Sequence, residues 1–82
     1  FRGVHEVQII ATVLGIENFH PSCISEKKEL SDGRISATVH INSTEWLIGV
    51  VMASAGNIEV IQPTEIRDKV VTRISRWFEN NP

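Results

Sequence analysis

Several residue types that build functional sites are scarce in this chain. It has a single cysteine, Cys23, which rules out an internal disulfide and is compatible with a reducing cytoplasm. It has no tyrosine, and no predicted strand carries an aromatic residue in its middle, which excludes a sheet that stacks RNA bases. The five glycines lie far apart, so the chain lacks a glycine-rich loop for phosphate groups.

Long apolar runs and an excess of basic residues are also missing. No apolar stretch approaches the roughly 18–20 residues that span a bilayer, and the start of the chain has no signal-peptide pattern. The formal net charge is −2, whereas tight duplex binding is usually accompanied by a basic footprint. We therefore expect a cytoplasmic protein without a membrane partner.

Catalytic and metal-binding patterns are missing as well. Three histidines (His5, His20 and His40) accompany Cys23, but their spacing matches no metal motif because a second close pair is absent. No acid is placed to orient His20 beside Cys23, and the carboxylates are spread singly along the chain. We expect no enzyme activity, no cofactor and no metal.

The composition is that of an ordinary globular domain. The 82 residues are 41% hydrophobic and 22% charged, which predicts one domain over residues 1–82. A chain of this size buries only about 60–65% of its unfolded surface. The first residue is Phe1 rather than Met, so we expect the C-terminal piece of a longer protein.

The first half of the chain is predicted to form three strands and a short helix. The strands span residues 4–13, 24–30 and 35–41. In the first strand Val7, Ile9, Ala11 and Val13 share one face. The short helix is expected within residues 14–19, and Asp32-Gly33 predicts a hairpin with a type I′ turn.

The second half is predicted to form a helix, a strand and a longer helix. Asn42 or Ser43 caps an apolar helix over residues 45–55, and Gly56 ends it. A strand follows over residues 58–61. The last helix begins at Pro63 or Thr64 and carries an apolar stripe, namely Ile66, Val70, Ile74 and Trp77 or Phe78. The order predicts an α+β fold, a ferredoxin-like βαββαβ sandwich with an additional C-terminal helix.

The helix over residues 45–55 has no charged residue after Glu45, so it is apolar nearly all the way round. One sheet cannot cover all of that surface. A neighbouring helix of the same chain or a partner chain could cover the remainder, and both readings stay open. We expect a dimer or domain interface at Trp46, Leu47, Val50, Val51 and Met52.

Lys69, Arg73 and Arg76 follow one another at helical spacing and line one face of the last helix. One reading is a solvated face that Glu65 partly neutralises. The other reading is a strip that meets phosphates of an effector or a carboxylate of a partner domain.

The chain resembles the C-terminal WCX domain of WYL-domain transcriptional regulators over residues 7–78. That domain shows a Trp-Leu helix, a glycine, a strand ending in proline, and a pair ending in arginine that opens the last helix. The matching positions are Trp46-Leu47, Gly56, Val60, Pro63 and Ile66-Arg67. Upstream, His20-Pro21-Ser22 and Asp32-Gly33 are similar to further family features, whereas the first helix is shorter than is usual in the family.

The resemblance implies a bacterial regulator with three parts: a helix-turn-helix domain that contacts promoter DNA, a central WYL domain and this module. It implies a homodimer, contact with a WYL domain and a nucleic-acid effector. Arg67 matches the family arginine, so Arg67, Arg73 and Arg76 are candidate effector or nucleic-acid contacts, although Arg67 could equally be structural. The alternative is a small-molecule regulatory domain of the ACT-like type, for which Gly15 is the only glycine after the first strand.

Overall fold

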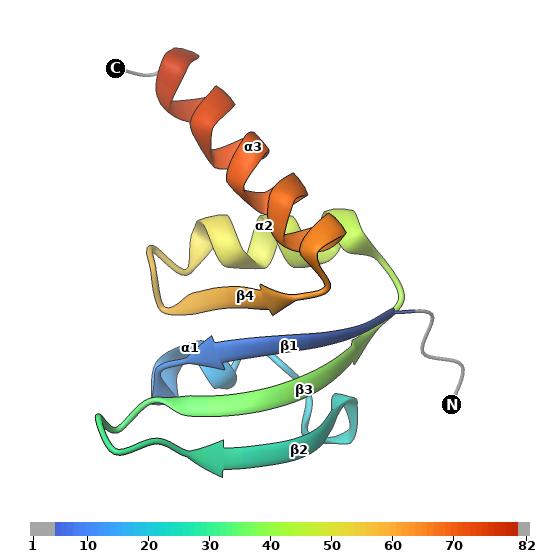
Figure 1. The fold of residues 1–82 in the computed structure, drawn as a ribbon, viewed down its shortest axis with the longest axis vertical. Coiled ribbons are helices and arrows are strands. Elements are labelled where there is room, and N and C mark those ends of the chain that lie inside the picture. The colour runs from blue at the N-terminus through green and yellow to red at the C-terminus, as the bar shows by residue number, and fades with distance from the viewer. Residues whose placement is uncertain (1–4, 81–82) are drawn as a thin grey trace.

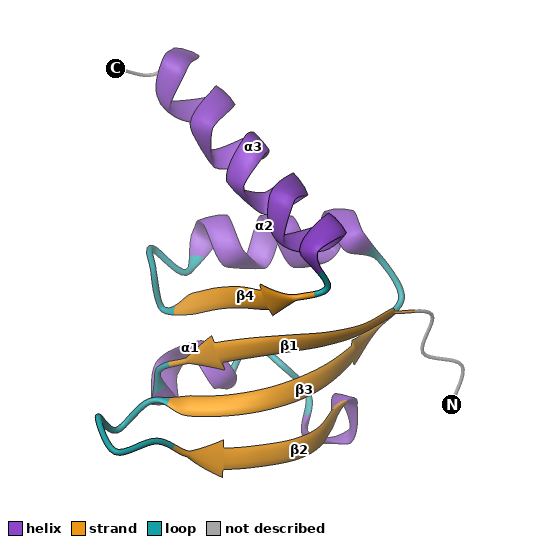
Figure 2. Cartoon of the chain, viewed as in Figure 1, coloured by secondary structure: helices purple, strands orange, loops and turns teal. Residues whose placement is uncertain are grey.

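The computed structural model describes residues 5–80 and has the predicted α+β class (Figures 1 and 2). Its elements are β1 (His5–Ala11), α1 (Val13–Ile16), the short 3₁₀ helix η1 (Pro21–Cys23), β2 (Ile24–Glu29), β3 (Ile35–Ile41), α2 (Thr44–Ala53), β4 (Ile58–Gln62) and α3 (Thr64–Asn80). The four strands form one antiparallel sheet in the order β2-β3-β1-β4. Within this part of the chain, no helix is both long and apolar enough to cross a membrane.

Strand register gathers the apolar side chains on one face of the sheet. Val7 lies opposite Val39 and Ile9 lies opposite Ala37, so the alternating residues of β1 and β3 point to the same side. In Figure 1, α1 and α2 lie behind the sheet. Leu47 and further side chains of α2 fill the space between these layers and complete the core.

The last helix, α3, packs against its own domain through about its first three turns, as far as Ile74. Its first two turns bury Ile66 and Val70 in the core beside β4 and α2. Figure 1 shows the remainder of α3 projecting beyond the sheet. The predicted apolar stripe is thus confirmed at Ile66 and Val70 and in part at Ile74, while Trp77 and Phe78 are exposed.

The first strand is shorter than predicted. It ends at Ala11, and Thr12 caps α1: its Oγ1 accepts a hydrogen bond from the Gly15 N–H at 3.1 Å. The Thr12 N–H donates to the Asn57 carbonyl at 2.9 Å, which fixes the turn against the start of β4. Val13 therefore lies in α1, is exposed, and does not share the strand face as expected.

The hairpin between β2 and β3 is confirmed, but its turn type is not. The Gly33 N–H donates to the Leu30 carbonyl at 3.0 Å and the Leu30 N–H donates to the Arg34 carbonyl at 2.7 Å. Among the residues of this turn only Gly33 has a positive φ, of 87°, which is typical of a three-residue turn with a glycine bulge rather than type I′. Asp32 accepts from the backbone N–H and Nε of Arg34, and these bonds lower the pKa of its carboxyl.

Both ends of α2 are capped by residues that lie next to them in the sequence. Ser43, one of the two predicted caps, accepts a hydrogen bond from the Trp46 N–H through its Oγ at 3.1 Å. At the other end Ser54 is the C-cap, and Ala55 occupies the left-handed position with a φ of 55°. Gly56, with a φ of 90°, is therefore the second residue after the C-cap, whereas the sequence predicts it as the first.

Candidate interaction site

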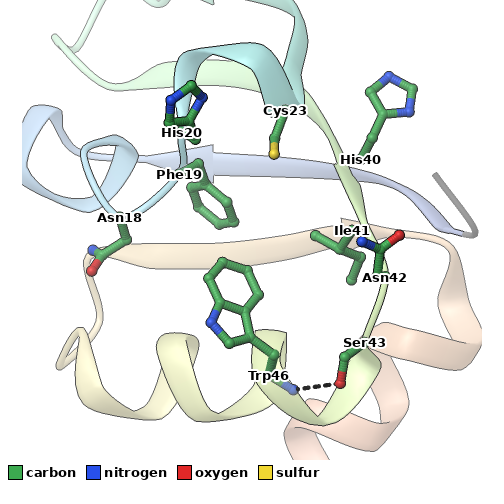
Figure 3. A pocket seen from close by; sticks show the side chains of 9 residues that line it. All are labelled: Asn18, Phe19, His20, Cys23, His40, Ile41, Asn42, Ser43 and Trp46. Carbon is green, nitrogen blue, oxygen red and sulfur yellow. Dashed lines mark hydrogen bonds between the residues drawn. The ribbon is translucent and has the colours of Figure 1, made fainter. Parts of the chain in front are cut away.

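Trp46 and Phe19 form one side of a pocket between α2 and the segment that links α1 to β2 (Figure 3). Their rings meet edge to face, with centroids 5.8 Å apart. Phe19 is buried, while 46% of Trp46 is exposed. The pocket has a volume of about 440 Å³. A half-exposed indole offers an apolar surface with a polar edge to whatever occupies this pocket.

The polar side chains of this pocket are largely engaged in local structure. The His20 Nδ1 accepts a hydrogen bond from the Ser22 N–H at 3.1 Å. The Asn18 amide donates to a backbone carbonyl of its own turn, and Ser43 caps α2 beside Trp46 (Figure 3). These three groups are turn and cap residues, and the pocket also presents the ring of Trp46 and the side chains of Cys23, His40 and Asn42.

Metal ligands do not gather at this pocket. His20, Cys23 and His40 all line it, but the His40 side chain points away from Trp46 in Figure 3. Within residues 5–80, no group of three or more His, Cys, Asp or Glu side chains is placed to hold a metal ion.

A second and more apolar hollow lies between the C-terminal half of α2 and the outer half of α3. Its volume is about 550 Å³. The α2 side presents Gly49, Met52 and Ala53, and the α3 side presents Trp77 and Phe78. The two aromatic rings meet edge to face with centroids 5.3 Å apart, and 61% of Phe78 is exposed. Exposed aromatic residues beside small residues are typical of interaction surfaces.

This hollow continues along α3 towards β4. A smaller hollow of about 210 Å³ is bounded by Arg67, Val71 and Glu59, and 52% of Val71 is exposed. Val51 and Ile74 line both hollows, so the two hollows adjoin each other along α3. We call the two adjoining hollows together the α3 groove.

The five α2 residues expected at an interface have different environments. Leu47 is 0% exposed and Val51 is 6% exposed, so the sheet and α3 bury both within the chain. Val50 and Met52 are half-buried against the core, and Trp46 is the most exposed. The accessible part of the expected interface is therefore Trp46, Val50 and Met52.

The three arginines singled out from the sequence do not form one cluster. Arg73 pairs with Glu45 of α2, with its Nη2 3.1 Å from each carboxylate oxygen. Arg76 lines the same cleft as Arg73 and Lys69, between α2 and α3. Arg67 instead lines the α3 groove beside β4. The structure therefore separates Arg67 from the other two.

Sequence reasoning did not place several of these residues at a site. The sequence predicts Trp77 or Phe78 at the end of an apolar stripe, and its pattern gives no reason to single out Val71 or Gly49. The available signal was the length of the last helix: its apolar repeat runs well past the point where a short β4 can cover it. The pairing of Phe19 with Trp46 has no signal in the local pattern, because it joins segments that lie far apart in the sequence.

The chain was compared with known proteins in three ways. No curated protein and no solved structure matched it. The family model of the WCX domain matches residues 6–78, a segment that begins in β1 and ends in the last turns of α3. The match covers nearly every element described above, including both hollows and the three arginines, and so this chain belongs to the WCX domain family.

Proposed function

We propose that this chain is a non-enzymatic dimerisation and effector-response domain of a cytoplasmic WYL-type transcription regulator that binds DNA through another domain. Membership in the WCX family supports the regulatory context. The observation that carries the dimerisation role is the α3 groove, an apolar surface flanked by the exposed rings of Trp77 and Phe78.

The physical basis of this role is the burial of exposed apolar surface. Removing such surface from water contributes about 25 cal/mol per Å². Large apolar side chains that remain exposed on a small domain therefore favour association when a complementary surface meets them. An effector that changes the packing of this domain then changes the spacing of the DNA-reading domains attached to it.

The proposal includes the finer fold assignment. The split βαβ plan threads four antiparallel strands with the first strand between the third and the fourth, and the order β2-β3-β1-β4 supports it. The departure is α1, which has four residues and is much shorter than α2.

Arg76 and Arg67 are the arginines we propose for contact with an anionic effector or a partner domain. Both are exposed, and neither makes an ion pair with another residue among those described, 5–80. An anion that binds Arg73 has to compete with Glu45. The proposed contact to a nucleic-acid effector therefore rests first on Arg76, which lies outside the α3 groove.

The ACT-like alternative receives less support. It needs a glycine after β1 that lets a ligand approach the backbone. Gly15 is buried, and a Cβ at this position would collide with the Asn57 carbonyl oxygen. Packing between α1 and the start of β4 accounts for this glycine.

Sedimentation equilibrium over a wide concentration range tests the dimerisation role. We expect a reversible monomer–dimer equilibrium that Phe78→Ser weakens. Leu14→Ser is the matched control, because Leu14 is also large, apolar and exposed but lies on α1, outside the α3 groove. A wild-type chain that stays monomeric at every concentration would contradict the proposal.

A further inference from the structure

We propose that two copies of this domain pair through antiparallel α3 helices, so that each copy covers the projecting half of the other copy's α3. This inference rests on the proposed dimerisation function and specifies the surface and the partner. Three observations carry it: the spacing of one stripe on α3, the position of the α3 groove beside that stripe, and the charge at the two ends of the stripe.

The stripe consists of Arg67, Val71, Ile74 and Phe78. Intervals of four, three and four residues place these side chains on one face of the helix, as in the seam of a coiled coil. Ile66 and Val70 lie to one side of this face and hold α3 on its own domain. Ile74 packs partly against the core, whereas Val71 and Phe78 stay exposed although α3 is already docked, so these two side chains are not needed for the fold of one copy.

The α3 groove gives this stripe a place to bind. It runs from Gly49 and Met52 of α2, past Ile74, to Glu59 beside β4. A helix laid along it would contact both the docked half and the projecting half of α3.

The charges at the ends of the stripe favour an antiparallel partner with the same sequence. When Val71 lies opposite Ile74 of the partner subunit, Arg67 lies opposite Phe78 of the partner subunit. The guanidinium of Arg67 then reaches an aromatic face, with the carboxylate of Glu79 one residue further on. Both contacts occur twice, because an antiparallel pair related by a two-fold axis repeats every contact.

A second copy is therefore the occupant that this surface fits. A two-fold interface must be complementary to itself, which requires a hollow and a protrusion on the same patch. The α3 groove and the ring of Phe78 provide both, and Arg67 and Glu79 provide both signs of charge.

Disulfide trapping tests the register. In a Cys23→Ser background, chains with Val71→Cys are mixed with chains carrying Ile74→Cys, and the mixture is oxidised under mild conditions. The matched control pair is Lys69→Cys with Arg76→Cys. In the proposed register these two positions also lie at the same level along the paired helices, but on the side of α3 that faces the cleft with Glu45.

We expect a cross-linked dimer from the mixture of the Val71 and Ile74 variants and at least about tenfold less from the control mixture. Phe78→Ser should raise the dimer dissociation constant at least about tenfold, since each dimer loses two buried rings. Equal cross-linking in both mixtures, or none in a chain that sediments as a dimer, overturns the antiparallel pairing and leaves the dimerisation role intact. A wild-type chain that sediments only as a monomer removes both proposals.

Discussion

Arg73 of α3 and Glu45 of α2 form an ion pair in which one guanidinium nitrogen, Nη2, lies 3.1 Å from both carboxylate oxygens. The pair connects the first turn of α2 to the part of α3 where the helix leaves the core. Both side chains are partly exposed, so solvent screens their attraction. The pair orients the two helices more than it stabilises them.

A double-mutant cycle with Glu45→Gln and Arg73→Gln should therefore give a coupling energy of about 0.2–1 kcal/mol. Chemical unfolding in urea measures it, and the value should fall as salt is added. Arg76→Gln combined with Glu45→Gln is the control, because no ion pair joins those residues. A coupling well above 2 kcal/mol would show that the pair is a structural anchor.

Gly15→Ala should destabilise the domain by about 1–3 kcal/mol, because the added methyl group meets the backbone carbonyl of Asn57. Gly49→Ala is the matched change, since a Cβ at Gly49 meets nothing within 4 Å. Replacing this helical glycine should stabilise the fold by up to about 1 kcal/mol. Thermal unfolding of both variants at low protein concentration compares them, and equal effects would contradict the close packing at Gly15.

Val51→Glu should unfold the domain rather than separate a dimer. The sequence alone favours the opposite outcome, with assembly disrupted more than the fold. Val51 is 6% exposed and belongs to the core, so an unpaired carboxylate there costs several kcal/mol. Circular dichroism should show loss of structure, whereas a substitution at the exposed Glu59 should leave the spectrum unchanged. A folded, monomeric Val51→Glu variant would instead show that Val51 lies in an interface between chains.

The hairpin should lose part of its stabilisation in acid because of Asp32. Hydrogen bonds from the backbone N–H and side chain of Arg34 lower the pKa of this carboxyl below 3.8 in the folded state. A depressed folded pKa means that the stabilisation is present above pH 3.8 and is lost as the pH falls through the folded value. Titration of the Asp32 carboxyl by NMR should give that lower value, and Asp32→Asn should remove this part of the acid dependence. A titration at the ordinary value would show that the two hydrogen bonds do not persist in solution.

Arg76→Ala should weaken the binding of an anionic effector without changing the dimer. Fluorescence anisotropy with a labelled single-stranded oligonucleotide measures the binding. The slope of log affinity against log salt should become shallower by about 0.7 if Arg76 contacts one phosphate. Lys28→Ala on β2 is the control, since Lys28 carries the same charge but lies far from the cleft of α2 and α3. An equal loss in both variants would indicate a general charge effect.

The sequence was sufficient for elements whose local pattern agrees with their environment. The alternation of Ile35, Ala37, Val39 and Ile41 predicts β3, which has those bounds. The hairpin at Asp32-Gly33 and the cap at Ser43 follow from turn and cap chemistry that involves only neighbouring residues. For the same reason the α+β class could be predicted.

Features that depend on distant contacts could not be predicted. An apolar helix such as α2 gives no indication of which side is covered, so Leu47 and Trp46 were grouped although one is buried and the other half-exposed. The end of β1 was misplaced because the bond from Thr12 to the Asn57 carbonyl joins residues far apart in the sequence. Likewise, the apolar repeat of a helix does not indicate how far the neighbouring sheet extends along it. The exposure of Phe78, which lies beyond that sheet, could therefore not be predicted.

Because α3 is anchored to the core through its N-terminal part, a small tilt of this helix moves its projecting end the furthest. A helix of 17 residues is about 25 Å long. If it tilts by about 10° at its Thr64 end, the far tip moves by about 4 Å, more than the length of a hydrogen bond. Such a tilt moves Phe78 much further than it moves Ile66 and Val70 near the anchored end, so contacts at Phe78 are the first to be made or broken. Small changes in how the start of α3 packs on the core therefore become large changes in the position of its projecting end.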